Sequence, residues 1–204
     1  MTSLPIQPLA SGDIPAFAPA AGPLSPAHLA QIDDATRRGK KLRRAMVVAT
    51  IDAWLTAIFA GLTALSGLFS IVGLILGLAL GVIAWNAFRG ASELKQFNPA
   101  APRRLALNQL ALAGLLISYA VYSIFTASLS SEFGAAMADP ELARMLGPID
   151  QFIHLITILV YGGLIIGTTL AQGLAALYYA GRAKHLHAYR AATPEWILQI
   201  QRRA

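Results

Sequence analysis

Residues 45–88 read AMVVATIDAWLTAIFAGLTALSGLFSIVGLILGLALGVIAWNAF and contain one charged side chain, that of Asp52. A helix needs about 20 consecutive, mainly apolar residues to cross the hydrocarbon core of a bilayer. The stretch is therefore long enough for two membrane-spanning helices joined by a tight turn. We predict that these two helices cover residues 46–66 and 70–88.

Two more uncharged stretches follow, at residues 105–131 and 151–181. Each is long enough for one spanning helix, so we predict a third span over residues 105–127 and a fourth over residues 151–180. The predicted fold class is therefore all-α. The chain should be a polytopic membrane protein whose four-transmembrane-helix bundle occupies residues 45–181.

The composition agrees with this prediction. Hydrophobic residues make up 56% of the 204-residue chain and charged residues 13%, whereas soluble proteins contain about 25% charged residues. The chain has no cysteine, which excludes disulfides, thiolate catalysis and metal sites with cysteine ligands. We expect no cofactor and no bound metal, because His185 and His187 would point to nearly opposite sides of a helix.

The basic residues are distributed unequally between the two sides of the predicted membrane. Of the sixteen Lys and Arg residues, Arg144 alone falls in the loop 128–150, and the others flank the spans on the opposite side. Short loops rich in Lys and Arg stay in the cytoplasm. We therefore expect a multi-pass protein with N-in/C-in topology, both termini being cytoplasmic. The same bias accounts for the net charge of +6 without a nucleic-acid partner. The absence of cysteine and the richness in Ala, Leu and Gly fit a bacterial inner (cytoplasmic) membrane.

The N-terminal part of the chain precedes the first span and divides into two segments. Residues 1–26 contain six prolines among small residues, and we predict that they are disordered, because such a segment cannot bury enough apolar surface to fold. Residues 27–44 are predicted to form a basic juxtamembrane helix. Ser25 and Pro26 have the residue types of its cap and its first turn.

Two short helices are expected near the fourth span. One would begin at Pro140 in the preceding loop and end at Gly147 and Pro148. The other would lie at the membrane surface within the basic cytoplasmic tail, residues 182–204. Its apolar face would consist of Trp196, Ile197 and Ile200.

Small residues recur at four-residue intervals on two of the predicted spans. There is little hydrophobic drive between helices in lipid, so small residues mark places where two backbones approach closely. We therefore predict close helix contacts along both ridges, either within the bundle or between the copies of a homo-oligomer. The ridges are Gly73, Gly77 and Gly81 on the second span, and Gly163, Gly167, Ala171 and Ala175 on the fourth.

Each predicted span carries polar side chains in its cytoplasmic half. Asp52 lies eight residues beyond Arg44, about 12 Å along a helix, and a charge at that depth is costly unless it faces protein or water. One interpretation is a hydrogen-bonded layer that fixes the alignment of the helices. The other is a cytoplasm-facing binding or proton site. The candidate residues are Asp52, Asn86, Asn108, Gln109 and Gln172.

Six cations precede the first span within eight residues. They orient the protein in the membrane, and they are numerous enough to attract anionic lipid headgroups as well. The candidates for the aromatic belt at the membrane surface are Tyr178, Tyr179, Trp85, Tyr119 and Tyr122. The six cations are Arg37, Arg38, Lys40, Lys41, Arg43 and Arg44.

The sequence contains no motif of a zinc protease, a serine hydrolase or a P-loop nucleotide-binding protein. We therefore expect a non-enzymatic structural or interaction subunit that forms a homo-oligomer or binds another membrane protein. The alternative is a small transporter or channel built around Asp52. The outer halves of the spans are nearly all aliphatic, which favours the structural subunit, because a transport pathway needs polar residues across the whole membrane.

Overall fold

The computed structural model describes residues 24–129 and 140–203. All regular secondary structure in these two ranges is helical, which confirms the predicted all-α class. The predicted disordered tail lies almost entirely outside the described residues. The elements are α1 (Pro26–Arg38), α2 (Lys40–Ser66), the short 3-10 helix η1 (Gly67–Phe69), α3 (Ile71–Lys95), α4 (Ala101–Leu129), α5 (Pro140–Ala192) and α6 (Glu195–Arg203).

Four helical segments of the described chain are long and apolar enough to cross a membrane, and they confirm the four predicted spans in order. Each extends further into its basic flanking segment than predicted. A helix does not stop at its first cation, because Lys and Arg are good helix formers whose long side chains can reach the aqueous surface. The segments are Lys40–Phe69, Ile71–Lys95, Ala101–Thr126 and His154–Ala192.

α5 is a single helix of 53 residues. It begins at Pro140 as predicted, but the predicted end at Gly147 and Pro148 is wrong. A proline removes one backbone hydrogen bond and can bend a helix, yet the turns on either side of it can continue. At 1.5 Å per residue the helix is about 80 Å long, whereas the hydrocarbon core of a bilayer is about 30 Å thick.

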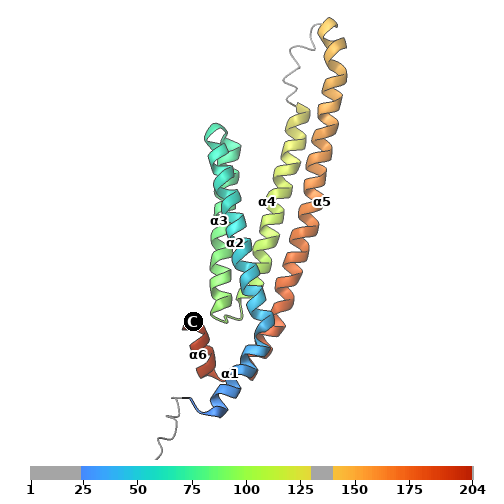
Figure 1. Ribbon diagram of the computed structural model, residues 1–204. Helices are drawn as coiled ribbons and strands as arrows, with labels where there is room; N and C mark the ends of the chain where they lie inside the picture. The colour runs from blue at the N-terminus through green and yellow to red at the C-terminus, as the bar shows by residue number, and fades with distance from the viewer. Residues whose placement is uncertain (1–23, 130–139, 204) are drawn as a thin grey trace, which may run out of the picture.

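The helices form two hairpins, α2–α3 and α4–α5, which lie together at one end and diverge toward the other (Figure 1). Contacts between α3 and α4, and fewer between α2 and α5, join the hairpins. α1, α6 and the α3–α4 turn all lie where the hairpins meet (Figure 1). We call this the basic end. The first and last described helices share it, as an even number of spans requires.

The basic segment predicted as one helix, residues 27–44, is divided at Gly39 between α1 and α2. α1 has the predicted cap, because the Ser25 side chain accepts a hydrogen bond of 3.3 Å from the backbone N–H of His28. At Gly39 the chain passes close to α5, since a Cβ added there would lie 3.3 Å from the Tyr189 ring. The junction thus packs the start of α2 against the end of α5.

α2 and α3 pack along small side chains. Several buried positions of α3 are spaced alternately by four and three residues, which is the seven-residue repeat of helices that coil around each other. A Cβ added to Gly77 would lie 2.6 Å from the backbone nitrogen of Ala64, so this position admits only glycine without a shift of the backbone. The buried positions are Gly77, Leu80, Ala84, Ala87, Ala91 and Leu94 on α3, and Ala45, Ala49, Ala53 and Ala60 on α2.

The glycine ridge predicted on α3 contacts neighbouring parts of the chain at Gly73 and Gly77 but not at Gly81. Gly73 lies against Gly67 and Gly77 is buried, whereas a Cβ on Gly81 would meet nothing within 4 Å. Four residues advance by 400°, so a strict four-residue series drifts around a helix by about 40° at each step. The contact therefore passes from Gly77 to Leu80 instead of Gly81.

The turn between α3 and α4 is closed by a residue other than glycine in the left-handed conformation. Phe97 has a φ of 57°, where glycine is usual. Its N–H bonds to the carbonyl of Leu94, and the N–H of Asn98 bonds to the carbonyl of Glu93, which is the Schellman pattern of a helix end. This conformation brings the Phe97 ring to a centroid distance of 5.5 Å from the Tyr189 ring.

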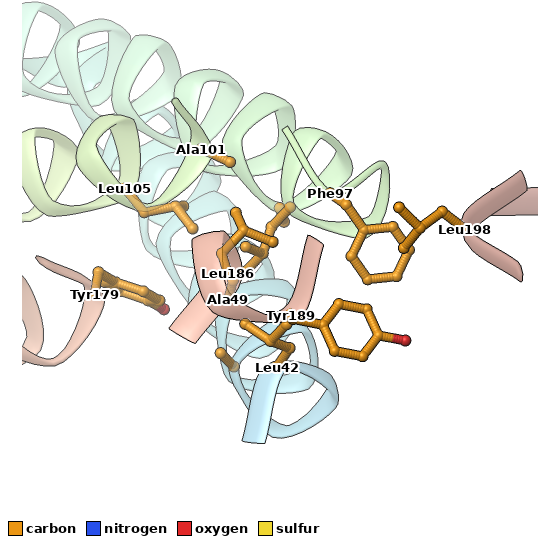
Figure 2. Packing of buried hydrophobic residues seen from close by; sticks show 12 residues of the cluster. Leu42, Ala49, Phe97, Ala101, Leu105, Tyr179, Leu186, Tyr189 and Leu198 are labelled. Atoms are coloured by element: carbon orange, nitrogen blue, oxygen red, sulfur yellow. The ribbon is translucent and has the colours of Figure 1, made fainter. Parts of the chain in front are cut away.

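The largest apolar core lies at the basic end and joins side chains from α2, α3, α4, α5 and α6 (Figure 2). Tyr179 and Leu186 of α5 enter it beside Leu42 of α2 and Leu105 of α4. A smaller cluster further along the spans joins α2, α3 and α4. Beyond it the hairpins diverge, and their outward apolar side chains form a surface suited to lipid tails. The smaller cluster consists of Ala60, Leu80, Ile83 and Leu112.

The structure corrects the predicted apolar face of the C-terminal helix. Ile197 and Leu198 are buried, whereas Ile200 is 50% exposed. Trp196 packs edge-on against His28 of α1, with ring centroids 5.3 Å apart. α6 therefore docks onto α1 and the apolar core of its own chain, and it does not present Trp196, Ile197 and Ile200 as one face.

The charge distribution predicts that the basic end is cytoplasmic. Single cysteines at Ala30, Pro99 and Gln199, which are exposed at this end, should not react with a membrane-impermeant maleimide in intact cells. A cysteine at residue 136, between the third and fourth spans, should react. Permeabilised cells are the control, because all four positions should then be labelled. Labelling of the Pro99→Cys variant in intact cells would contradict this topology.

The packing of α2 on α3 predicts that Gly77→Leu lowers the stability of the protein. A leucine there overlaps the Ala64 backbone, and overpacking of this kind typically costs about 1–3 kcal/mol. The measurement is thermal unfolding of the purified protein in detergent. Gly81→Leu is the matched control, because its side chain enters open space on the same helix. Equal melting temperatures for the two variants would show that α2 and α3 do not need a small residue at Gly77.

Candidate functional site

The clearest polar contact inside the predicted membrane domain joins α2 to α4. Asp52 is half-buried on α2, and Gln109 of α4 is 1% exposed. Nε2 of Gln109 donates a hydrogen bond to Oδ2 of Asp52. The backbone carbonyl of Asp52 accepts a second bond, of 2.9 Å, from the Thr56 hydroxyl. The carboxylate, which would be costly in lipid, is therefore held against a neighbouring helix.

Tyr179 of α5 adds a third side chain, and we call Asp52, Gln109 and Tyr179 the polar cluster. Tyr179 is 1% exposed, and it lies close enough to Asp52 for the two to interact electrostatically. The Tyr179 hydroxyl and Oε1 of Gln109 are both buried and have no hydrogen-bond partner in the described chain. Leaving a buried polar group unpaired costs about 1–3 kcal/mol. The cluster thus has unused hydrogen-bonding capacity at two atoms.

The prediction that Tyr179 belongs to the aromatic belt is wrong, because its ring is buried in the core at the basic end. The sequence contained a signal for this position. Tyr179 follows Gln172 by seven residues, which is two helical turns, so the two residues share a face. Leu186 follows after seven more residues and is also buried. Trp85, by contrast, is 71% exposed and stays a candidate for the belt.

The remaining polar candidates do not join this cluster. Asn86 and Asn108 instead line a separate cleft of about 400 Å³ between α3 and α4, together with Arg103 and Arg104. Gln172 is half-buried, and its side chain makes no hydrogen bond in the described part of the chain. Of the five predicted polar residues, the structure therefore brings Asp52 and Gln109 into direct contact and places Asn86 and Asn108 at the same cleft.

The small-residue ridge of α5 faces away from the rest of the chain. Gly163, Gly167 and Ala171 are exposed, and a Cβ on either glycine would meet nothing within 4 Å. The buried side of α5 instead carries Thr168 and Ala176. Ala175, the last residue of the predicted ridge, is half-buried. In the part of the chain that the structure describes, no helix packs on the exposed part of this ridge, and contact between copies remains as the predicted alternative.

The predicted cationic run surrounds a cleft of about 690 Å³ at the basic end, which α5 closes with His185 and Tyr189. One cation of this run, Arg38, is already paired within the chain. Arg38 pairs with Asp34 and donates a hydrogen bond of 3.1 Å to the carbonyl of Ala192, the last residue of α5. The cations that line this cleft are Arg37, Arg38, Lys40, Lys41 and Arg44.

Chemically, the polar cluster can hold helices together or exchange a proton. It pairs one carboxylate with an amide donor and a nearby phenol. Among the described residues, no group of three His, Asp or Glu side chains is placed to hold a metal ion. Comparison of the chain with protein-family models, with curated proteins and with solved structures finds no match. The function therefore has to be argued from the geometry of this chain.

The geometry of the polar cluster predicts the effect of Asp52→Asn. Asparagine keeps an oxygen that can accept the hydrogen bond from Gln109, so the melting temperature in detergent should hold or rise. Asp52→Leu leaves the Gln109 amide without its partner and should cost about 1–3 kcal/mol. Proton flux into liposomes, followed with a pH-sensitive dye, should be the same for the parent and for Asp52→Asn.

A flux that is present in the parent and in Asp52→Glu but absent in Asp52→Asn would contradict the structural interpretation. Asparagine cannot titrate, whereas glutamate can. Equal expression and equal melting of the three proteins would show that the lost flux is not a folding defect.

Proposed function

We propose that this protein is a non-enzymatic subunit of a bacterial inner membrane that associates with a second copy of itself through the outward face of α5. The exposure of Gly163, Gly167 and Ala171 supports this proposal most directly. Small residues at four-residue spacing let two helix backbones approach closely, and such approach is a main source of attraction between helices in lipid. No helix of the described chain covers this ridge.

The low burial of α5 supports the same proposal. Only 6% of its most apolar stretch is buried in the chain, compared with 28–39% for the other three spans. α5 meets α4 along one side and touches α2 in fewer places. The opposite side is thus accessible to a partner along most of the span. Another membrane protein with a complementary ridge is the alternative partner.

The remaining features suit a structural role. The polar cluster links α2, α4 and α5 where the hairpins meet, so it would fix their relative alignment. The cations of the basic end would keep both termini in the cytoplasm and attract anionic lipids. Neither role requires a chemical reaction, which is the basis for proposing a non-enzymatic protein.

The second candidate function is a small transporter or channel centred on Asp52. The unpaired Tyr179 hydroxyl and Gln109 oxygen favour it, because ionisable and polar groups inside a membrane often mark a pathway. The outer halves of the spans are nearly all aliphatic, which disfavours a transporter, because a transport pathway needs polar residues across the whole membrane. The flux comparison of the parent, Asp52→Glu and Asp52→Asn distinguishes the two functions.

The proposed α5 interface predicts that the purified parent is oligomeric and that Gly167→Leu dissociates it. The leucine would separate backbones that glycine allows to touch, and we expect association to weaken by at least about tenfold. The measurement is mass by light scattering during size-exclusion chromatography in detergent. Melting of the separated chain should be unchanged, since the new side chain meets nothing within its own chain.

Gly81→Leu is the matched control for this experiment, because it also adds a leucine to an exposed glycine of a span. It should leave the oligomer intact. A monomeric parent, or an oligomer that Gly167→Leu does not weaken, would refute the α5 interface.

A further inference from the structure

Two cavities adjoin at the basic end, where α2 begins and α3 ends. The first, of about 480 Å³, is bordered by α2, α3, α5 and α6. The second, of about 370 Å³, follows α2 toward the apolar part of the span. Arg43, Met46 and Lys95 line both cavities. The two therefore form one groove with a shared wall, which we call the α2–α3 groove.

The first cavity is rich in hydrogen-bond donors and has no acidic residue in its lining. Three cations, Arg43, Lys95 and Arg202, face it. The Tyr189 hydroxyl donates a hydrogen bond of 2.6 Å to Oε1 of Gln201, which leaves the amide N–H groups of Gln201 available to another acceptor. The cavity is thus suited to an anion with several oxygen acceptors.

The charges in the groove are only partly neutralised by the protein. Arg202 pairs with Glu195 at 3.3 Å. Glu93, the acidic residue of α3, is engaged by Arg89 and Arg104. Within the described chain, Arg43 and Lys95 have no carboxylate partner, although Arg43 donates a hydrogen bond to the carbonyl of Thr36. Two adjacent cations without a counter-charge repel each other, and a bound anion would relieve this repulsion.

The second cavity has a different character. Beyond the shared wall it is lined by Val47, Thr50 and Ile51, which lie one to two helical turns further into the span than Arg43. Val47 is 58% exposed and Ile51 55% exposed. The Thr50 hydroxyl donates a hydrogen bond of 2.9 Å to the carbonyl of Met46 in the same helix, so it does not donate to a ligand in the cavity. This part of the groove is suited to a hydrocarbon chain.

We propose that the α2–α3 groove binds one anionic phospholipid. Its phosphate would lie between Arg43, Lys95 and Arg202, and one acyl chain would follow Val47 and Ile51 along α2. The order of the two chemistries matches a lipid in the leaflet at the basic end, because the polar cavity lies outside and the apolar cavity lies deeper in the span. This site lies apart from the α5 interface, so it can be present whether or not the protein associates through α5.

The headgroup part is tested with the purified protein in detergent, by native mass spectrometry with added phosphatidylglycerol or phosphatidylcholine. We expect the parent to retain phosphatidylglycerol in preference to phosphatidylcholine. Lys95→Gln should weaken phosphatidylglycerol binding about fivefold, the change that corresponds to the loss of one cation near an anionic lipid. Lys184→Gln, which removes an exposed cation outside the groove, is the matched control and should bind like the parent.

The acyl-chain part is tested with Ile51→Trp, whose ring would occupy the apolar cavity. It should weaken phosphatidylglycerol binding without a change in charge. Ile58→Trp is the matched control, because Ile58 is similarly exposed on α2, at 54%, but lies outside the groove. Inorganic phosphate should not displace the lipid. Displacement by phosphate alone, or equal lipid binding by the parent, Lys95→Gln and Ile51→Trp, would overturn the proposal.

Discussion

The apolar core at the basic end is the interaction on which the arrangement of the helices depends. Burial of apolar side chains stabilises a protein where the alternative is contact with water, but it contributes little where the alternative is contact with lipid. Phe97 and Leu198 belong to the α3–α4 turn and to α6, outside the four long apolar segments, and Leu186 lies near the end of α5, beyond the predicted fourth span. The hydrophobic effect can therefore act on this core, which explains why the hairpins meet here and diverge further along the spans.

The contacts inside the spans are of a different kind. α2 and α3 approach through alanine and glycine, so dispersion forces between closely packed backbones replace the hydrophobic effect. The Asp52–Gln109 hydrogen bond adds a directional contact between the hairpins, and such bonds between helices in a membrane contribute about 0.6–2 kcal/mol. Tyr179 belongs both to the polar cluster and to the apolar core. The hydrogen bond and the apolar core therefore hold the two hairpins together at the same place.

This arrangement leaves two surfaces available for partners of different chemistry. The outward face of α5 is apolar, with a ridge of small residues that suits another helix. The α2–α3 groove combines cations with an apolar channel that suits a lipid. The ridge lies along the middle of α5, whereas the groove touches α5 only at Tyr189 near its end, so occupation of one surface does not block the other. The ridge is accessible because the hairpins are held together at the basic end and α5 is mostly uncovered along its span. The groove is open at the surface of the basic end itself, where Val47 and Ile51 are exposed.

The sequence by itself determined the helical class, the number of spans and the cap at Ser25, because each follows from local composition and from the requirement that backbone groups in lipid bond within a helix. It also indicated that Asp52 faces protein or water and not lipid. Only the tertiary structure decided which faces meet. Gly77 and Gly167 have similar spacing patterns, yet one is buried and the other is exposed. Spacing shows that a helix can be approached closely, but the partner depends on contacts between segments far apart in the chain. Tyr179 differs, because its spacing from Gln172 and Leu186 already placed it on one face with them.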